Sequence, residues 1–209
     1  MEYLISSIIG LLLGSFPTAY ILVKKASGID IRNEGSGNVG AFNSLKVSKS
    51  KLIGFSVLLI DFLKGGISTL IPLLIFPNEF IFPALALTFA VFSHCFNPWL
   101  KFKGGRGLAT AAGGAALIFP FLLVVWCILW VIFYLMKRDI IFANILSTIF
   151  SLLLVYGTSN IAVKYAYPRP LDISTLIMVS TAVLLIIFIK HIDPLIEIIS
   201  KTKKIGKIK

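Results

Sequence analysis

The chain has 209 residues, 57% of them hydrophobic, and its mean hydropathy is +0.95. Soluble domains average roughly 45–50% apolar residues, so this composition excludes an ordinary soluble domain and indicates a protein embedded in a membrane. A formal net charge of +11 would suit a polyanionic partner, but the basic residues occupy short stretches between apolar runs and form no basic stripe interleaved with aromatic residues, so we expect no nucleic acid partner.

A helix needs about 20 mostly apolar residues to cross the hydrocarbon core of a bilayer. Apolar runs follow one another at Tyr3–Val23, Leu52–Phe76, Phe80–Phe96, Leu108–Phe119, Phe121–Met136, Ile140–Tyr156 and Ile173–Ile189. The run 108–119 is rich in Ala and Gly and too short for an upright crossing, so we expect a half-buried or broken element packed against its neighbours. The predicted fold is all-α, with one domain over residues 1–209 that forms an integral membrane bundle of about seven transmembrane helices.

The charge of the connections alternates along the chain. Six basic residues lie in 24–51, three in 101–106, two at 137–138 and six from Lys190 onward, whereas the connections at 77–79 and 120 carry none. Because basic residues concentrate in cytoplasmic loops, this pattern predicts a cytoplasmic C-terminus and an N-terminus on the outside. The two longest informative connections, 24–51 and 97–107, are then both cytoplasmic.

The first of these connections is dense in glycine. It reads Arg32-Asn33-Glu34-Gly35-Ser36-Gly37-Asn38-Val39-Gly40-Ala41-Phe42-Asn43-Ser44-Leu45-Lys46. Glycines that alternate with Ser36 and Asn38 let the backbone turn sharply and aim N–H groups at one point, an arrangement that cradles phosphate oxygens. Arg32 and Lys46 flank the turn with positive charge. The alternative is a flexible loop at the membrane interface.

The second connection places glycines between cations, as Lys103-Gly104-Gly105-Arg106-Gly107, directly before an apolar run. Backbone N–H groups at a helix N-terminus, together with two cations, would hold an anionic group at the membrane surface. The spacing is not that of a nucleotide P-loop. The alternative is ordinary anchoring by basic residues on the cytoplasmic side.

Charged residues also occur inside the apolar runs. Asp61 and Lys64 stand three residues apart, so they share a helix face and are expected to form an ion pair, with a structural or a catalytic role left open. The two histidines, His94 and His191, have no carboxylate cluster beside them, so we expect no metal site.

Four patterns taken together resemble one family. They are R-x-x-G-S-G-N-x-G-A-x-N over 32–43, D-x-x-K-G over 61–65, H-x8-K-G-G-[KR]-G-x-A-T over 94–110 and a basic residue followed by His-x-Asp over 190–193. In order and spacing they are similar to the acyl-phosphate:glycerol-3-phosphate acyltransferases, the PlsY family. The resemblance implies a seven-span protein of the bacterial inner membrane with its active site on the cytoplasmic side. It also implies transfer of a fatty acyl group from acyl phosphate to the sn-1 hydroxyl of glycerol 3-phosphate, giving lysophosphatidate and phosphate, with membrane lipids as surroundings and no cofactor or metal.

Carried over residue by residue, the resemblance implies catalytic roles for Ser36, Asn38 and His191. The phosphate-binding residues that it implies are Arg32, Gly37, Gly40, Asn43, Lys46, Lys103, Gly104, Gly105, Arg106 and Gly107, and the supporting residues are Asp61, Lys64 and His94. We expect direct attack by the acceptor hydroxyl, with the donor's phosphate or His191 taking the proton, because Ser36 has no partnered base in the sequence.

The chain departs from the family pattern mainly near its C-terminus. Lys46 and Lys190 stand where the family has Arg, and Arg106 stands where it has Lys; the charge is kept but the donor geometry differs. Pro194 replaces an Asn, and a late glutamate is missing from 200–209. One alternative is therefore a divergent family member with changed or lost acyl transfer. A small-anion membrane transporter is the other, although it would require charges on several spans or internal repeats.

Overall fold

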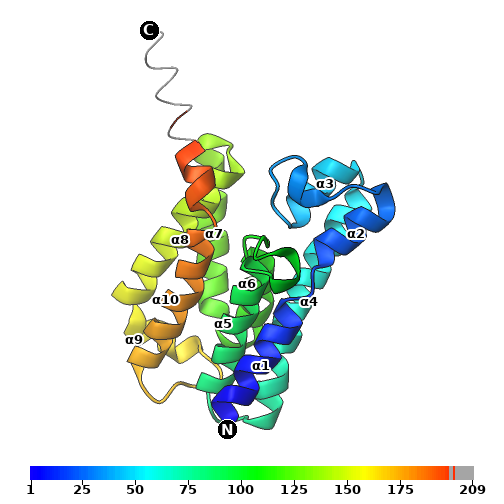
Figure 1. The fold of residues 1–209 in the computed structure, drawn as a ribbon. Helices are drawn as coiled ribbons and strands as arrows, with labels where there is room; N and C mark the ends of the chain where they lie inside the picture. Colours follow the sequence, from blue (N-terminus) through cyan, green and yellow to red (C-terminus); the bar gives the residue numbers. More distant parts are fainter. Residues whose placement is uncertain (198–199, 201–209) are drawn as a thin grey trace.

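The computed structural model describes residues 1–197 and 200, and every regular element among them is a helix (Figure 1). The α-helices are α1 (Glu2–Gly14), α2 (Thr18–Ser27), α3 (Ala41–Ser48), α4 (Lys51–Ile75), α5 (Ile81–Cys95), α6 (Leu108–Ile118), α7 (Pro120–Lys137), α8 (Ile140–Gly157), α9 (Ser159–Ala162) and α10 (Ile173–Ile189). Short 3-10 turns are η1 (Ile31–Asn33), η2 (Pro98–Leu100) and η3 (Val163–Tyr165). The predicted all-α class is confirmed.

Each predicted apolar run is helical. Within the described residues, 5 helical stretches are long and apolar enough to cross a membrane, namely Glu2–Ser27, Lys51–Ile75, Ile81–Leu100, Pro120–Lys137 and Ile140–Gly157. The remaining apolar helices, α6 and α10, have 11 and 17 residues. The protein is therefore an all-helical membrane protein in which two apolar helices are shorter than a standard crossing.

The first apolar run is broken between α1 and α2. Pro17 has no N–H and cannot continue the hydrogen-bond ladder of α1. Side chains from other elements donate to carbonyl groups at the break: Lys64 Nζ donates to Phe16 O at 2.9 Å, and Asn97 Nδ2 donates to Ser15 O at 2.6 Å. A break inside a membrane segment is stable because these groups replace the missing backbone partners.

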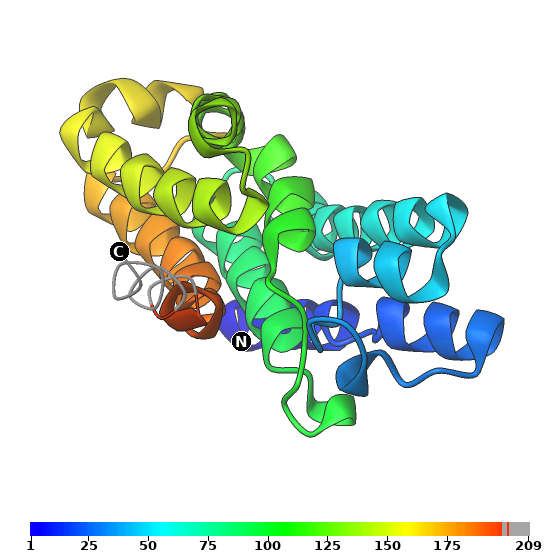
Figure 2. The ribbon, with the colours of Figure 1, turned by 90° about the horizontal axis from the view of Figure 1, so that it is seen from above.

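Helices α5 and α6 occupy the middle of the bundle, with α1 and α4 on one side and α8 and α10 on the other (Figures 1 and 2). The contact of α4 with α6 depends on glycine: a Cβ at Gly65 would lie 1.9 Å from Thr110 O, and one at Gly113 would lie 1.9 Å from Phe62 O. Small residues let two membrane helices approach closely and gain van der Waals contact. The Ala/Gly-rich run was expected to pack as a short element, and α6 does so.

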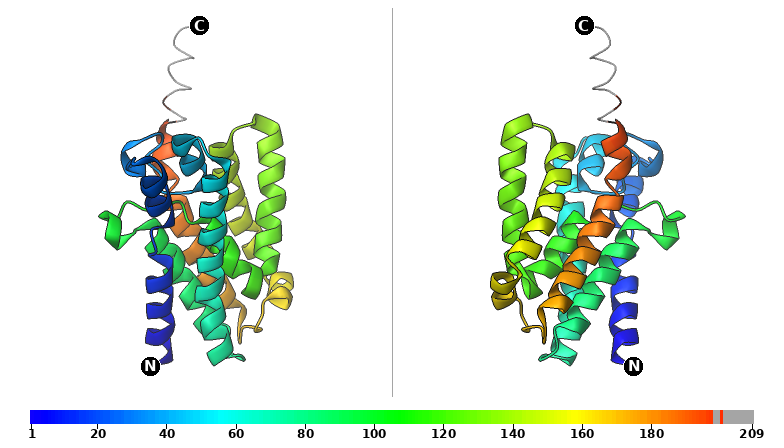
Figure 3. Two further views of the ribbon diagram at one scale, coloured as in Figure 1. Left: turned by 90° about the vertical axis from the view of Figure 1, so that its right-hand side faces the viewer. Right: turned by 90° about the vertical axis from the view of Figure 1, so that its left-hand side faces the viewer.

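One end of the bundle holds the first glycine-rich connection and the end of α10 (Figure 1). Helices α2 and α3, the turn between α7 and α8, and the end of α10 all lie at the end opposite the start of α1 (Figure 1). The connection that contains η2 leaves the side of the bundle and returns to begin α6 (Figure 3). The motifs of both glycine-rich connections are thereby brought towards the same region.

Candidate active site

A cavity of about 300 Å³ lies between the two glycine-rich connections. Its lining residues are Gly35, Ser36, Asn38, Gly40, Ala41, Phe42, Lys46, Leu58, Asp61, His94, Arg106, Gly107, Leu108, Ala109, Ile140, Ile141 and Asn144. Segments more than 60 residues apart in sequence meet there, since α3 approaches the start of α6 across the inner faces of α4 and α5.

Three helices begin at this cavity. The first turns of α3, α6 and α8 contribute lining residues, and the first intrahelical hydrogen bonds start only at the N–H groups of Ser44, Ala111 and Ala143. Helix N-termini carry partial positive charge and N–H groups without helical partners, which makes them anion-binding elements. The N-termini of α3 and α6 thus add partial positive charge to the cavity, whereas that of α8 is capped by the Asp139 carboxylate, which accepts from Phe142 N at 2.8 Å.

The first glycine-rich loop is organised by one amide. The Asn43 side chain, which is 2% exposed, accepts a hydrogen bond from Ser36 N at 3.0 Å. Its Nδ2 donates to the carbonyl oxygens of Glu34 and Asn38, both at 3.0 Å. Gly37 adopts φ +67°, a left-handed conformation that only glycine takes without strain. Asn43 does not line the cavity but holds Ser36 and Asn38 at its edge.

The second loop packs beneath His94. Gly105 N donates to His94 O at 3.1 Å, and a Cβ at Gly105 would lie 2.2 Å from His94 Nε2 and 2.7 Å from Val39 O. A side chain at 105 would therefore force the loop away from both the histidine and the first loop. Gly107 has φ +82° and forms the N-cap of α6, which directs the first N–H groups of that helix to the cavity.

The predicted cations occupy different places. Lys46 and Arg106 line the cavity, whereas Lys103 is exposed and Arg32 pairs with Asp30, both outside it. The Arg32 guanidinium lowers the pKa of Asp30 to about 2, so that pair is ionised at neutral pH. Arg106 is half-buried, and no carboxylate of a described residue lies within ion-pair distance of it. Its charge is thus available to an anion in the cavity.

The expected ion pair inside α4 is confirmed. Lys64 Nζ lies 2.8 Å from Asp61 Oδ1, and both side chains are buried. His94 Nδ1 is 3.8 Å from the same oxygen, too far for a hydrogen bond. Asp61 and His94 border the cavity, while Lys64 faces the break after α1. The cluster therefore connects the site to the packing of α1, α4 and α5.

His191 is 1% exposed and does not line the cavity. Its Nδ1 contacts Ile187 O at 2.8 Å, and its Nε2 lies 3.5 Å from Asn144 Nδ2. Burial, together with the Arg106 cation, lowers the pKa of the His191 ring to about 4, so the ring is neutral at pH 7. The structure thus places Asn144, and not His191, at the cavity wall.

Sequence reasoning missed the contribution of α8. Ile140, Ile141 and Asn144 lie at the start of a run that the sequence marks only as a membrane helix. The one available signal was Asn144, an amide inside an apolar run, because intramembrane polar residues often have functional roles. Nothing in the sequence indicated that this helix begins beside the other two.

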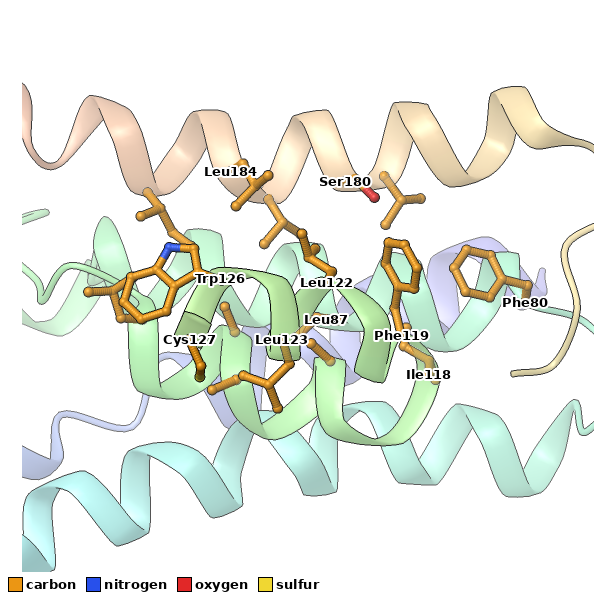
Figure 4. Close-up of a pocket in the computed structure, with 17 residues that line it drawn as sticks. Phe80, Leu87, Ile118, Phe119, Leu122, Leu123, Trp126, Cys127, Ser180 and Leu184 are labelled. Atoms are coloured by element: carbon orange, nitrogen blue, oxygen red, sulfur yellow. The ribbon is translucent and has the colours of Figure 1, made fainter. Parts of the chain in front are cut away.

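Two apolar spaces adjoin the polar cavity. A groove of about 340 Å³ along α3 and α4 shares Ala41, Phe42 and Leu58 with it. A smaller cavity of about 110 Å³ lies among α5, α6, α7 and α10 (Figure 4), and Ser180 supplies its hydroxyl group. The groove is the more open of the two, and it continues the polar cavity outward along the bundle.

Comparisons with known proteins identify the family of the chain. A family model described as glycerol-3-phosphate acyltransferase matches residues 4–201. The glycerol-3-phosphate acyltransferase of Bacillus subtilis (strain 168) is 31% identical over 196 residues, which are 94% of this chain and 93% of the relative. The glycerol-3-phosphate acyltransferase of Ehrlichia canis (strain Jake) is 33% identical over 192 residues, 92% of each chain.

The fold is also that of a solved membrane enzyme. A crystal structure of PlsY (YgiH), an integral membrane glycerol 3-phosphate acyltransferase in its glycerol 3-phosphate form, matches with a TM-score of 0.80 and 27% identity. The match covers 96% of this chain and 94% of that chain. A lysophosphatidic acid form of PlsY matches with a TM-score of 0.77. With a family model that spans nearly the whole chain and relatives aligned end to end, the chain belongs to the glycerol-3-phosphate acyltransferase family.

Proposed function

We propose that this protein transfers a fatty acyl group from acyl phosphate to the sn-1 hydroxyl of glycerol 3-phosphate. The observation that carries the proposal is the convergence of the N-termini of α3 and α6 with Lys46 and Arg106 around one cavity. Both substrates carry a phosphate, and a site with several positive elements and N–H donors suits two such anions. Solved PlsY structures in glycerol 3-phosphate and lysophosphatidic acid forms support the same acceptor and product.

The proposed reaction is a direct displacement. The acceptor hydroxyl oxygen attacks the acyl carbonyl carbon, the bond between that carbon and the phosphate oxygen breaks, and the hydroxyl proton passes to the departing phosphate. Acyl phosphate is already activated, so the chain's contribution is to hold both substrates close and to stabilise negative charge on the carbonyl oxygen. In this proposal the N–H groups at the start of α6 and the side chains of Ser36 and Asn38, which line the cavity, supply that stabilisation.

Two alternative chemical roles are disfavoured by the geometry. Ser36 Oγ has no hydrogen bond to a histidine or carboxylate in the described part of the chain, which argues against an acyl-serine intermediate. His191 lies behind Asn144 and its Nδ1 is engaged by Ile187 O, which argues against its acting as the base. The donor's own phosphate is therefore the proposed proton acceptor.

The open apolar groove is the proposed path of the acyl chain. It continues from the polar cavity past Phe42 and Leu58 and is bordered by Leu45 and Phe55 of the surrounding helices. A long alkyl chain can lie there while its phosphate occupies the polar cavity. In this arrangement the donor enters, and the product leaves, along the side of the bundle that faces lipid.

Purified protein in lipid nanodiscs, given acyl phosphate and glycerol 3-phosphate, should release phosphate and form lysophosphatidate. Acyl-CoA and acyl carrier protein should not replace the donor. Binding of glycerol 3-phosphate without product would instead support a divergent member that has lost acyl transfer. Uptake of glycerol 3-phosphate into proteoliposomes without any acyl donor would support a transporter and refute the proposal.

A further inference from the structure

Three side chains form a hydrogen-bonded series whose middle member lies at the wall of the active-site cavity. Trp130 of α7 donates from Nε1 to Asn144 Oδ1 of α8 at 2.7 Å. Asn144 Nδ2 lies 3.5 Å from His191 Nε2, and His191 Nδ1 lies 2.8 Å from Ile187 O. The series therefore links α7, α8 and the end of α10, and Asn144 is its member at the cavity wall.

The direction of every bond in this series is determined by chemistry. An indole N–H can only donate, so the atom of Asn144 that faces Trp130 must be its carbonyl oxygen. A backbone carbonyl can only accept, so His191 carries its proton on Nδ1 and leaves Nε2 as an acceptor for Asn144 Nδ2. The orientation of the Asn144 amide is thereby enforced from both sides.

One N–H of Asn144 remains free. The NH2 group has two hydrogens, and His191 accepts only one of them. Among the described residues no acceptor bonds the second, although Asn144 is 6% exposed and lines the polar cavity. Arg106 and the N-terminus of α6 border the same space. A buried N–H donor at the wall of a cavity that Arg106 also lines matches a phosphate oxygen.

We infer that Asn144 donates a hydrogen bond to a substrate phosphate and that Trp130 is the positioning residue that keeps the Asn144 NH2 group turned to the cavity. Without the indole N–H, only the 3.5 Å contact of Asn144 Nδ2 with His191 Nε2 opposes a 180° rotation of the amide that would present its oxygen to the anion. The inference rests on the proposed function for the identity of the phosphate ligand. It assigns His191 the role of second holder of the amide, in place of a base.

The test is a kinetic comparison of Trp130→Phe with Trp126→Phe, each measured for KM of glycerol 3-phosphate and for kcat in nanodiscs. Trp126 is the matched control, because its Nε1 also bonds α8, at Thr148 Oγ1 3.2 Å away, but outside the polar cavity. The phenyl ring that Trp130→Phe introduces would keep an aromatic contact with Tyr134, on which the indole stacks at a centroid distance of 5.0 Å. We expect Trp130→Phe to raise KM about two- to tenfold, as for loss of one net hydrogen bond, and Trp126→Phe to leave it unchanged.

Substitutions at Asn144 separate phosphate binding from a packing role. Asn144→Asp keeps the size and the oxygen that accepts from Trp130, but it places a negative charge towards the anion, so KM should rise more than in Asn144→Ala. If Trp130 acts only through Asn144, the double variant Trp130→Phe/Asn144→Ala should match Asn144→Ala alone. Additive losses would show that Trp130 acts through helix packing and would overturn the inference.

The outcomes distinguish this inference from the proposed function. A parent protein that forms no lysophosphatidate refutes the proposed function itself. An active parent whose Trp130→Phe and Trp126→Phe variants share one KM, or whose Asn144→Asp variant keeps the parental KM, refutes only the positioning role.

Discussion

At the scale of single residues, the site contains two kinds of polar group. Some form hydrogen bonds within the protein, and others are cations without an ion-pair partner among the described residues. Asn43 uses its amide entirely on the first loop, while Arg106 lines the cavity with no carboxylate of the described residues within ion-pair distance. Buried donors and acceptors are normally paired, so an unpaired buried cation marks the place for a ligand. This contrast separates residues that hold the loops in place from residues whose charge is available to a ligand.

The cavity cations should bind mainly through charge. Lys46→Arg and Arg106→Lys should keep appreciable activity, whereas Lys46→Ala and Arg106→Ala should lose about ten- to a hundredfold in kcat/KM, as expected for charge-assisted hydrogen bonds worth roughly 1.5–3 kcal/mol. Steady-state kinetics with each substrate varied in turn would measure this. Lys101→Ala is the control, because that lysine is exposed in the same connection and lies outside the cavity. If the alanine variants keep the parental kinetics, Lys46 and Arg106 do not bind substrate and only anchor the protein at the membrane surface.

His191 should make stability depend on pH. Its pKa is about 4 in the folded protein against 6.5 in an unfolded chain, so the unfolded state binds more protons between these values. Stability is therefore complete above pH 6.5 and should fall by up to about 3 kcal/mol as the pH drops towards 4. Thermal unfolding in detergent from pH 7.5 to 4 would show the slope. His191→Asn, which cannot titrate, should have a shallower slope; equal slopes would contradict a neutral buried His191.

At the scale of elements, the short helix α6 is the part that the site requires most. Its N-terminus faces the cavity, and its Ala/Gly face lets α4 approach within backbone contact. With 11 residues, α6 is shorter than a full crossing needs, and its N-terminus lies at the cavity between the helices. The Gly107 N-cap and the glycines that contact α4 together determine where the N-terminus of α6 lies.

Gly65→Ala should separate α4 from α6, because the added Cβ would meet Thr110 O at 1.9 Å. Overpacking of this kind costs about 1–3 kcal/mol, and a shift of α6 should lower kcat as well. Gly66→Ala is the neighbouring control, since its Cβ would make an ordinary contact of 3.5 Å with Gly113 O. Thermal unfolding and activity of both variants would check this. A Gly65→Ala protein as stable as Gly66→Ala would contradict the close contact.

At the scale of the whole molecule, the proposed topology has seven membrane-crossing segments, a single domain, an outside N-terminus and an active site on the cytoplasmic face of a bacterial inner membrane. The alternation of basic connections supports it. The first glycine-rich connection lies at the end of the bundle opposite the start of α1, and the second leaves the side of the bundle between its two ends (Figures 1 and 3). The basic tail at 201–209 and the missing glutamate of the family pattern lie outside the described residues.

Cysteine reporters can test this topology in intact cells. Reporters within 26–50 and 100–107 should be protected from a membrane-impermeant thiol reagent, and a reporter within 158–170 should react with it. The background must lack Cys95 and Cys127, which are free thiols. If only one of the two glycine-rich connections is labelled from outside, the two connections lie on opposite faces and a joint cytoplasmic site is refuted.

Much of this protein could be predicted from its sequence, because a bilayer imposes strong and local rules. Apolar runs must become helices, since backbone groups in lipid have no other partners, and Asp61 and Lys64 must share a helix face. The glycine and cation motifs likewise predicted two loops that serve one site, and residues of both loops line one cavity. Which cations reach the cavity was not predictable: Lys103 and Arg106 are three residues apart, yet only Arg106 lines it.

The sequence by itself therefore determined the all-helical membrane class, the positions of the helices and the family, because these depend on local hydropathy and on short motifs. Only the tertiary structure decided that α3, α6 and α8 begin at one cavity, that Asn144 and not His191 borders it, and that Asp30 holds Arg32 away from it. The physical reason is that these relations depend on how separate helices pack, at distances set by the small residues of α6 and by the break at Pro17, and no local pattern encodes the position of one helix end relative to another.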